Sequence, residues 1–243
     1  MKLFYRSFYS VILFSLCIVP VAQASVSIEG TRLIYPSSER EITIKMTNEG
    51  TAPALVQMWT DRGDPATQPQ NADAPFLITP PIFRIEPSKG QSVRLVFAGE
   101  KLPQDRESLF WFNALEIPPA NLDTDRSSMQ IAVRSRLKLF YRPANLPGDA
   151  ASAAYQVTWQ WVSAKGNGYA LRATNSSPYF VTYSKLELQV QGKKHNLGTG
   201  MIAPFDHLDF PVKGLNSKAA NSSLVYRPMN DYGVGAEQTV SIH

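Results

Sequence analysis

The stretch that decides the fold begins Leu102-Pro103-Gln104-Asp105-Arg106-Glu107-Ser108-Leu109-Phe110-Trp111-Phe112-Asn113 and continues through Ala114 and Leu115 to Glu116-Ile117-Pro118-Pro119. After a short polar turn it resumes as Met129-Gln130-Ile131-Ala132-Val133-Arg134-Ser135-Arg136-Leu137-Lys138-Leu139-Phe140-Tyr141-Arg142-Pro143. This pattern predicts two β-strands joined by a hairpin. The second strand alternates apolar and polar residues, and its polar side is unusually basic.

The rest of the chain repeats the same kind of pattern. Short apolar or alternating runs are separated by clusters of Gly, Pro, Asn and Asp; examples are Glu41–Met46, Ala54–Trp59, Ser92–Phe97 and Tyr155–Trp161. Short strands at this spacing predict an all-β sandwich or barrel. The 18 prolines fit turns and edge strands better than helices. The fold class predicted is therefore all-β.

A change of composition divides the chain in two. The segment Pro143-Ala144-Asn145-Leu146-Pro147-Gly148-Asp149 breaks the preceding strand and is followed by small residues. We place a domain boundary here, with domains over 25–147 and 148–243. Each length suits an immunoglobulin-like sandwich of roughly seven strands.

Residues 1–24 have the features of a secretory signal peptide. Lys2 and Arg6 precede the apolar run Val11–Val19, and Ala22-Gln23-Ala24 offers small residues where a signal peptidase reads. The alternative is a membrane anchor, but the apolar run is well short of the roughly 20 residues that a spanning helix needs. We predict cleavage after Ala24, export of the mature chain and a protein that is not integral to the membrane.

Charge and cysteine content exclude several classes of function. Loss of Lys2 and Arg6 with the signal lowers the formal net charge from +4 to +2, which is weak evidence for binding nucleic acid. The single cysteine, Cys17, lies inside the signal. The exported protein therefore has no disulfide, no thiol nucleophile and no cysteine metal site.

Catalytic patterns are weak. The histidines His195, His207 and His243 share no metal-ligand spacing, and Asp206-His207 with Asp209 is most simply a solvated turn. Two glycine pairs predict hairpin turns because no helix follows them; they are Gly166-Asn167-Gly168 and Gly198-Thr199-Gly200. We predict no enzyme, no metal and no cofactor.

The strand from Met129 is a candidate binding surface. Met129, Ile131 and Val133 share one face, because side chains alternate along a strand. They either fill the core of their own sandwich or lie on an edge strand that a partner covers, since an exposed apolar edge promotes aggregation. On the other face, Arg134 and Arg136 can act as charged residues that oppose self-pairing.

Arg32 is a second candidate, although an isolated arginine is usually a solvated surface charge. Paired with Lys138 across a cleft, it can bind a carboxylate through charge-assisted hydrogen bonds.

The ordered motifs along the chain resemble the periplasmic pilus-assembly chaperones. They are Leu102–Pro119, Lys138-Leu139-Phe140-Tyr141-Arg142-Pro143, Thr79-Pro80-Pro81 with Arg84 and Glu86-Pro87, and Asn230-Asp231-Tyr232-Gly233. The resemblance implies two immunoglobulin-like β-sandwich domains set at an angle with a cleft between them. It implies a chaperone that lends a strand to a pilin subunit and delivers it to an outer-membrane usher. The short turn before Met129 resembles the branch with a short loop, and the resemblance favours a cis peptide bond at Thr79-Pro80.

The resemblance also assigns roles to residues. It implies donor-strand residues at Met129, Ile131 and Val133, and a carboxylate anchor at Arg32 and Lys138. It further implies an interdomain charge network of Glu107, Arg142 and Asp231, and prolines linked to usher engagement at Pro53 and Pro81.

Simple alternation leaves one conflict, because Lys138 has the opposite parity to Val133. A bulge or a strong twist between them would reconcile the two roles. The exposed strand also predicts a weak homodimer of the free protein.

Two other classes of function compete with the chaperone. A secreted module that binds sugars would expose aromatic clusters at loop tips, whereas Trp159 and Trp161 share a strand face and more simply belong to a core or an edge. A periplasmic hydrolase would need a catalytic arrangement that the sequence lacks.

Overall fold

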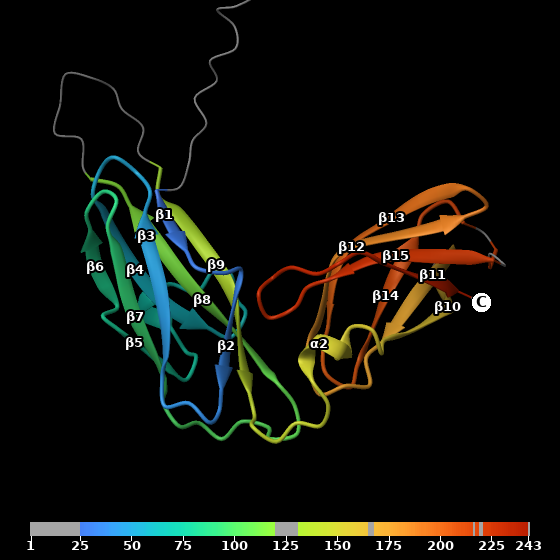
Figure 1. Cartoon of the computed structure of the whole chain (residues 1–243), viewed down its shortest axis with the longest axis horizontal. Coiled ribbons are helices and arrows are strands. Elements are labelled where there is room, and N and C mark those ends of the chain that lie inside the picture. The colour runs from blue at the N-terminus through green and yellow to red at the C-terminus, as the bar shows by residue number, and fades with distance from the viewer. Residues whose placement is uncertain (1–24, 120–130, 165–167, 216, 219–220, 243) are drawn as a thin grey trace, which may run out of the picture.

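Most strands form where the alternating runs of the sequence predict them. The computed structural model describes residues 25–119, 131–164, 168–215, 217–218 and 221–242. The predicted signal peptide and Met129 lie outside these residues. Figure 1 shows two β-rich domains that meet at an angle, with β9 and β12 on the sides that face each other. The all-β prediction is confirmed.

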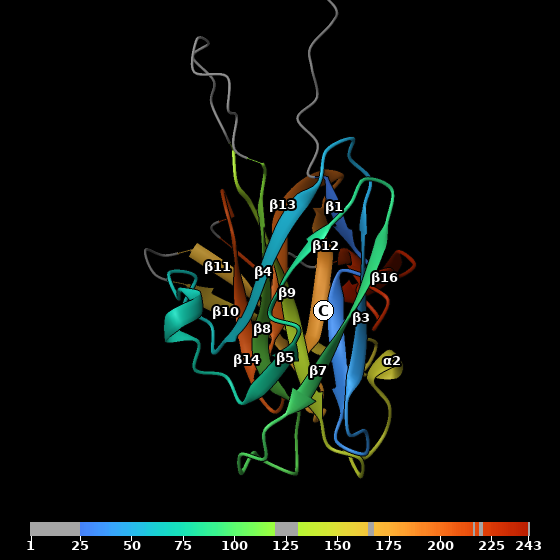
Figure 2. The same ribbon diagram turned by 90° about the vertical axis from the view of Figure 1, so that its left-hand side faces the viewer.

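The first domain packs two sheets face to face, as Figure 2 shows from the side of this domain. One sheet has the strand order β1-β3-β7-β5. Its bounds are β1 Val26–Ile28, β3 Ile42–Asn48, β7 Gly90–Phe97 and β5 Phe76–Thr79. The other has the order β2-β9-β8-β4-β6. Its bounds are β2 Arg32–Pro36, β9 Val133–Arg142, β8 Ser108–Ile117, β4 Ala54–Asp61 and β6 Ile82–Ile85.

Alternating side chains build the core between these sheets. In β7, Val93 and Leu95 are fully buried while Arg94 between them is exposed. In β8, Phe110 and Phe112 face the same core, so the run that opened the sequence argument forms its centre. Burying each of these side chains contributes about 1.5–3 kcal/mol, which drives the two sheets together.

The second domain has the same construction with fewer strands. Its sheets have the orders β10-β11-β14 and β13-β12-β15-β16. The bounds are β10 Thr158–Ala164, β11 Gly168–Thr174, β14 His207–Val212, β13 Lys193–Ile202, β12 Val181–Val190, β15 Ser222–Pro228 and β16 Gln238–Ile242. Trp159 and Trp161 pack in this core, as their shared parity indicates.

Short helices occur outside the sheets: η1 spans Pro69–Asn71 and α2 spans Ala150–Ala153. The Asp149 side chain caps α2 by accepting a hydrogen bond from the Ser152 backbone N–H. The backbone N–H groups of Tyr155 and Gln156 still hydrogen-bond to residues of α2, so β10 begins only at Thr158. The strand predicted from Tyr155 therefore starts three residues too early. Within the described residues, none of the helices has the length and apolar character to cross a membrane.

A second correction concerns the glycines of β13. Gly198 and Gly200 lie inside this strand, and the hairpin between β12 and β13 turns instead at Gln191 and Gly192, which have positive φ angles. Gly200 lies against the ring of Phe210, where an added Cβ would be 2.6 Å from the ring. The second glycine therefore serves close packing in β13 and not a turn.

Candidate functional site

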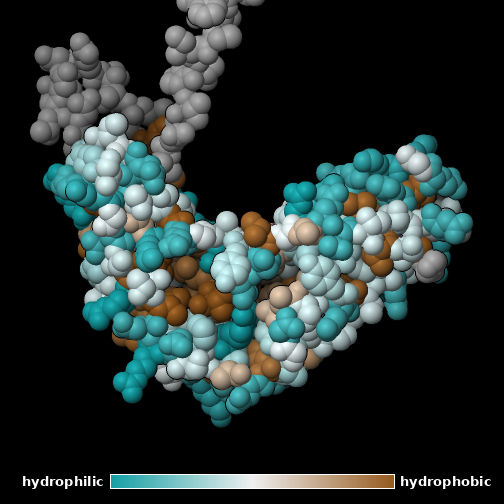
Figure 3. Space-filling model, viewed as in Figure 1, coloured by the Kyte–Doolittle hydropathy of each residue, from teal (hydrophilic) through white to brown (hydrophobic). Residues whose placement is uncertain are grey.

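The base of the interdomain hollow brings Arg32 and Lys138 together. Strand β2 begins at Arg32 and runs parallel to β9, with Arg32 opposite Lys138 in the register. Paired residues point to the same face of a sheet, so both cations lie on the outer face that looks toward the second domain. Figure 3 shows the hollow between the domains, with apolar surface on the part of the first domain that borders it.

Arg32 is buried without an anionic hydrogen-bond partner. Its side chain is among the buried polar groups, with 9% of the residue exposed. The Nη1 and Nη2 atoms donate to the carbonyl oxygen and the sulfur of Met229, at 3.4 and 3.2 Å. The Nε atom has no hydrogen-bond partner in the described part of the chain. Burial lowers the pKa of Arg32, against the opposing charges of Asp231 and Glu107.

Lys138 is partly buried and lines a pocket of about 390 Å³. The other walls come from the second domain and comprise Thr182, Tyr183, Ser184, Thr199, Gly200, Met201 and Met229. Burial, and then the positive charge of Arg32, lower the pKa of Lys138. Its ammonium makes no hydrogen bond or ion pair to any described residue.

These two cations are placed so that a single anion could contact both. Removing charged groups from water is costly unless each gains a partner of opposite charge. Here the described residues give Arg32 only neutral acceptors and give Lys138 none. A carboxylate that enters the pocket would supply charge-assisted hydrogen bonds to both.

Arg142, on the same face of β9, joins the two domains. Its Nε donates to Glu107 Oε1 at 2.7 Å, and Nη1 and Nη2 donate to the two carboxylate oxygens of Asp231 at 2.8 Å each. Burial alone would lower the pKa of Arg142, but its hydrogen bonds with Asp231 and Glu107 raise it. The structure thus brings together all three residues of the predicted charge network.

Glu107 ties this network to the second domain. It is 4% exposed, and its Oε2 accepts a hydrogen bond from the Phe180 backbone N–H at 2.7 Å. Its own N–H donates to the carbonyl of Pro178. Burial raises the pKa of Glu107, although Arg142 and the Phe180 N–H act in the opposite direction. The rings of Phe140 and Phe180 meet nearby with centroids 5.4 Å apart.

The turn after β15 carries Asp231 to the first domain, and Figure 1 shows this segment reaching across the junction. The Asn230 side chain accepts hydrogen bonds from the backbone N–H groups of Tyr232 and Val234, which closes the turn. Gly233 has φ +81°, and an added Cβ would collide with the hydroxyl of Thr31. The motif therefore needs glycine both for its backbone angle and for its approach to the residue before Arg32.

The N-terminal half of β9, Val133–Leu137, has one edge that pairs with no described strand. Strand β2 pairs only with Lys138–Arg142, so among the described residues no strand pairs with that side of Val133–Leu137. Ile131, just before the strand, is 61% exposed, and Val133 is partly buried. Ile131 is therefore not a residue of the sandwich core.

Of the two distortions that could have reconciled Val133 with Lys138, a bulge is absent. The register of β9 with β8 runs without a shift from Val133 to Tyr141. Leu139 and Tyr141, which share the parity of Val133, belong to the core of the first domain, whereas Lys138 and Arg142 face the second domain. The two sets of predicted residues thus lie on opposite faces of one regular strand.

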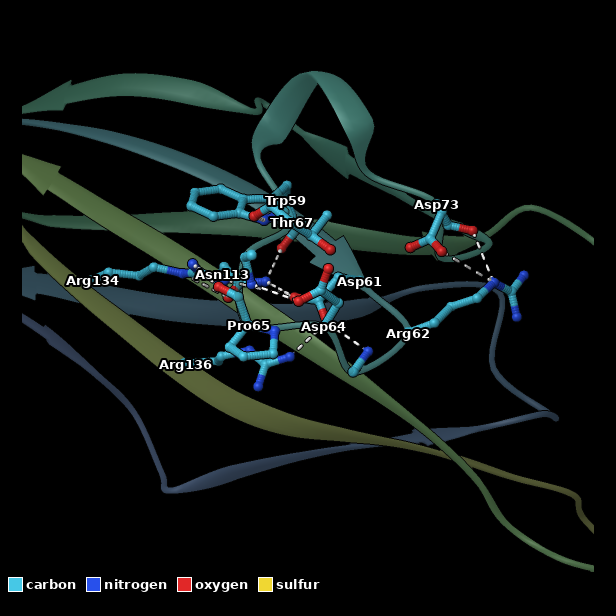
Figure 4. A network of polar contacts seen from close by, with 12 residues as sticks. Trp59, Asp61, Arg62, Asp64, Pro65, Thr67, Asp73, Asn113, Arg134 and Arg136 are labelled. Atoms are coloured by element: carbon cyan, nitrogen blue, oxygen red, sulfur yellow. Dashed lines mark hydrogen bonds and ion pairs between the residues drawn. The ribbon is translucent and has the colours of Figure 1, made fainter.

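A cluster of charged and polar side chains, which the sequence did not reveal, links β9 to β8 and β4 on their outer face (Figure 4). It consists of Asp61, Asn113, Arg134 and Arg136. Asp61 is fully buried and accepts hydrogen bonds from Arg136 Nη2 at 2.6 Å, Asn113 Nδ2 at 2.7 Å and the Gly63 N–H at 2.7 Å. Arg134 donates from Nε and Nη2 to Asn113 Oδ1. Burial alone would raise the pKa of Asp61, but these hydrogen bonds lower it.

Both arginines of this cluster also stack on tryptophans. Arg134 lies 4.8 Å from the ring centroid of Trp59, and Arg136 lies 4.1 Å from that of Trp111. They are tied to the sheet rather than presented as free charges that oppose self-pairing. In the sequence, Asp61 is a single acidic residue at the end of the run that forms β4, and no motif links it to its arginine partners.

The two predicted prolines are not neighbours. Pro53 precedes β4 and Pro81 precedes β6, and in the antiparallel pairing of these strands they fall at opposite ends. Pro53 borders a shallow pocket of about 320 Å³ with Leu55, Arg84, Ile117 and Pro118. The Thr79-Pro80 peptide bond is cis.

The histidine cluster carries no site in the described residues. Asp206 and His207 form an exposed pair, and both carboxylate oxygens of Asp209 bind Arg172 instead. No group of three or more His, Cys, Asp or Glu in the described part of the chain is placed to hold a metal ion.

Comparison with protein families accounts for both domains. Residues 25–147 match the model described as "Pili and flagellar-assembly chaperone, PapD N-terminal domain", and residues 152–240 match "Pili assembly chaperone PapD, C-terminal domain". The chain belongs to this family. Its members are chaperones and not enzymes.

Curated relatives agree along most of the chain. The probable fimbrial chaperone YadV of Escherichia coli K12 is 40% identical over 88% of this chain and 88% of its own length. The chaperone FimB/FhaD of Bordetella pertussis is 41% identical over 89% and 87%.

Solved structures share the fold. The YadV chaperone superposes with a TM-score of 0.77 at 38% identity, covering 90% of this chain and all of its own. SafB of Salmonella enterica, solved as a chaperone in complex with the SafA pilin, has a TM-score of 0.73 at 25% identity over 91% and 98%. The predicted fold, two immunoglobulin-like sandwiches set at an angle, is confirmed.

Proposed function

We propose that this chain is a periplasmic chaperone that lends β9 to a pilin subunit, anchors the subunit's C-terminal carboxylate on Arg32 and Lys138, and delivers the subunit to an outer-membrane usher. The observation that carries the proposal is the pair of cations without an anion at the end of an open strand edge. SafB, a relative solved in complex with a pilin, supports the same class of partner.

The open edge supports strand lending. An added strand would pair its main chain with the free side of Val133–Leu137, and the alternate side chains would provide specificity. Ile131 is exposed and Val133 is partly buried, so both can be covered further by a partner. With Met129, each would contribute about 1.5–3 kcal/mol on full burial.

The two faces of β9 divide the work. Side chains of Val133 parity lie on the inner face of β9, and at its open N-terminal end a subunit's groove could cover them, while Lys138 faces the hollow. A carboxylate fixed at Arg32 and Lys138 would set the register of the added strand. A shift by one residue would turn every subunit side chain to the wrong face.

The charge network would hold the angle between the domains. Among the described residues, only Arg142 hydrogen-bonds to both Glu107 and Asp231, so its guanidinium joins a strand of the first domain to the turn after β15. We place the boundary between these domains after residue 147. Pro53 and Pro81 are proposed to act in usher engagement from the outer edge of the first domain.

The test is periplasmic co-expression with the pilin encoded nearby, followed by co-purification. The native chain should form a one-to-one complex, and Arg32→Ala and Lys138→Ala should lose it while remaining folded. Arg94→Ala is the matched control, because Arg94 is an exposed cation of β7 in the same domain. Full retention of the subunit by either anchor variant would refute the carboxylate role.

The same experiment separates the chaperone from a sugar-binding module. If the native chain is folded but captures no pilin, the sugar-binding module becomes the favoured function. Export is tested on the same preparation, since a periplasmic chain processed as predicted should begin at Ser25. A relative, SfaE, is described as a periplasmic chaperone at 27% identity.

We also propose that a second copy covers the open edge of β9 in the free protein. An unpaired edge is a template for another strand. Sedimentation at rising concentration should show a weak dimer that disappears when the pilin is bound. A strictly monomeric profile would contradict this.

A further inference from the structure

The pocket beside Lys138 contains another polar group without a partner. Thr182, in β12 of the second domain, is 7% exposed, and its Oγ1 makes no hydrogen bond to any described residue. A buried hydroxyl left unpaired costs about 1–3 kcal/mol. The other threonine of the pocket, Thr199, is exposed and can hydrogen-bond to water.

Thr182 is linked by a short chain of contacts to Arg32. The Met229 N–H donates to the Thr182 carbonyl oxygen at 2.9 Å, and the Met229 carbonyl oxygen and sulfur accept from Arg32. Lys138 lies opposite Arg32 in the register and shares the pocket with Thr182 and Met229. Two unsatisfied donors, Arg32 Nε and the Thr182 hydroxyl, therefore accompany an unpaired ammonium in one small region.

We infer that the hydroxyl of Thr182 is a third ligand of the subunit's C-terminal carboxylate, so that the anion is held by both domains at once. The inference rests on the proposed function, since it names a further residue of the same site. A carboxylate has two oxygens and about four lone-pair positions, which is enough to accept from Arg32, Lys138 and one hydroxyl together.

Met229 is the group that the carboxylate displaces. A carbonyl and a thioether are weaker acceptors for a guanidinium than a carboxylate oxygen, so the exchange on Arg32 favours the anion. Met229 lines the same pocket as Thr182, and its sulfur would leave Arg32 Nη2 free for the carboxylate if the side chain turned away. Binding would thus satisfy the three groups that the free protein leaves without an anion or a partner.

The test compares two synthetic peptides that carry the last residues of the pilin that co-purifies with the native chain, one as the free acid and one as the C-terminal amide. Binding is measured by calorimetry to the native protein, Thr182→Val, Thr182→Ser and Thr199→Val. Valine keeps the shape of threonine without the hydroxyl, serine keeps the hydroxyl, and Thr199→Val removes an exposed hydroxyl from the same pocket.

We expect Thr182→Val to weaken binding of the acid about tenfold, the equivalent of ~1.4 kcal/mol, and to leave binding of the amide unchanged. Thr182→Ser and Thr199→Val should bind the acid like the native protein. Equal losses for acid and amide, or no loss in Thr182→Val, would overturn the role of Thr182.

These outcomes are distinct from a failure of the proposed function. If the native protein fails to discriminate the acid from the amide, the carboxylate anchor itself is wrong. If it discriminates, and Arg32→Ala removes the discrimination while Thr182→Val does not, only the third ligand is wrong.

Discussion

Replacing Asp61 by Asn should destabilise the first domain, because it removes a fully buried charge without changing the shape of the side chain. Asp61 is 0% exposed and accepts hydrogen bonds from Arg136, Asn113 and Gly63. An amide at this position places an NH₂ group against the Asn113 NH₂. Asn113 cannot turn around without losing its two hydrogen bonds from Arg134.

The expected loss is about 3 kcal/mol. Breaking a buried ion pair by removing one partner costs about 3–5 kcal/mol. The lower end applies here because the Arg136 side chain is 20% exposed and water can solvate part of its charge. With a urea m-value of about 2 kcal/mol/M, this loss lowers the midpoint of the first domain by roughly 1.5 M.

Urea unfolding followed by tryptophan fluorescence measures the effect. Two of the four tryptophans, Trp59 and Trp111, lie in the first domain, and the other two lie in the second. Asp209→Asn is the control, since its pair with Arg172 lies on the surface, where ion pairs contribute little. A first-domain midpoint that is unchanged in Asp61→Asn would refute the argument that this cluster stabilises the sheet.

Three further predictions follow from the described contacts. The pKa of Asp61 is lowered on folding, so its contribution is present above the unfolded value of about 3.9 and is lost as pH falls through the folded pKa. The urea midpoint of the native first domain should therefore drop between about pH 5 and about pH 2 more steeply than that of Asp61→Asn. Parallel pH curves for the two proteins would contradict this. Asp231→Asn should weaken the bidentate contact with Arg142 and increase the radius of gyration in X-ray scattering, with both domain midpoints unchanged. Gly233→Ala should produce the same expansion because the added methyl meets Thr31, and an unchanged scattering curve would count against the role of this turn.

The alternation of side chains made most of the strands predictable. Residues such as Val93 and Leu95 occupy one face and Arg94 the other, and this period depends only on local backbone geometry. Helix α2 was missed because it is one turn long, although Asp149 and Ser152 have the spacing of a helix cap. The turn predicted at Gly198 and Gly200 was misplaced, because a glycine needed for packing looks the same in sequence as a glycine needed for a turn.

In the candidate site too, some residues could be predicted from the sequence and others could not. Arg32 and Lys138 were paired through motifs and family resemblance, and the structure places them opposite each other in parallel strands. Nothing in the local sequence marked Thr182 or Met229, since a threonine in a strand and a methionine before a turn are ordinary. They came to notice only through contacts between distant segments: Arg32 meets Met229 across 197 positions, and the Met229 N–H in turn donates to the carbonyl oxygen of Thr182.

The sequence by itself determined the all-β class, the two domains and the family, because strand period, turn residues and ordered motifs are local properties of the chain. Only the tertiary structure decided that β9 is regular, that its open edge ends where β2 begins, and that Asp61 holds its arginines. It also decided which polar groups at the domain junction lack partners. Hydrogen-bond satisfaction depends on where distant segments meet, and no local pattern records that.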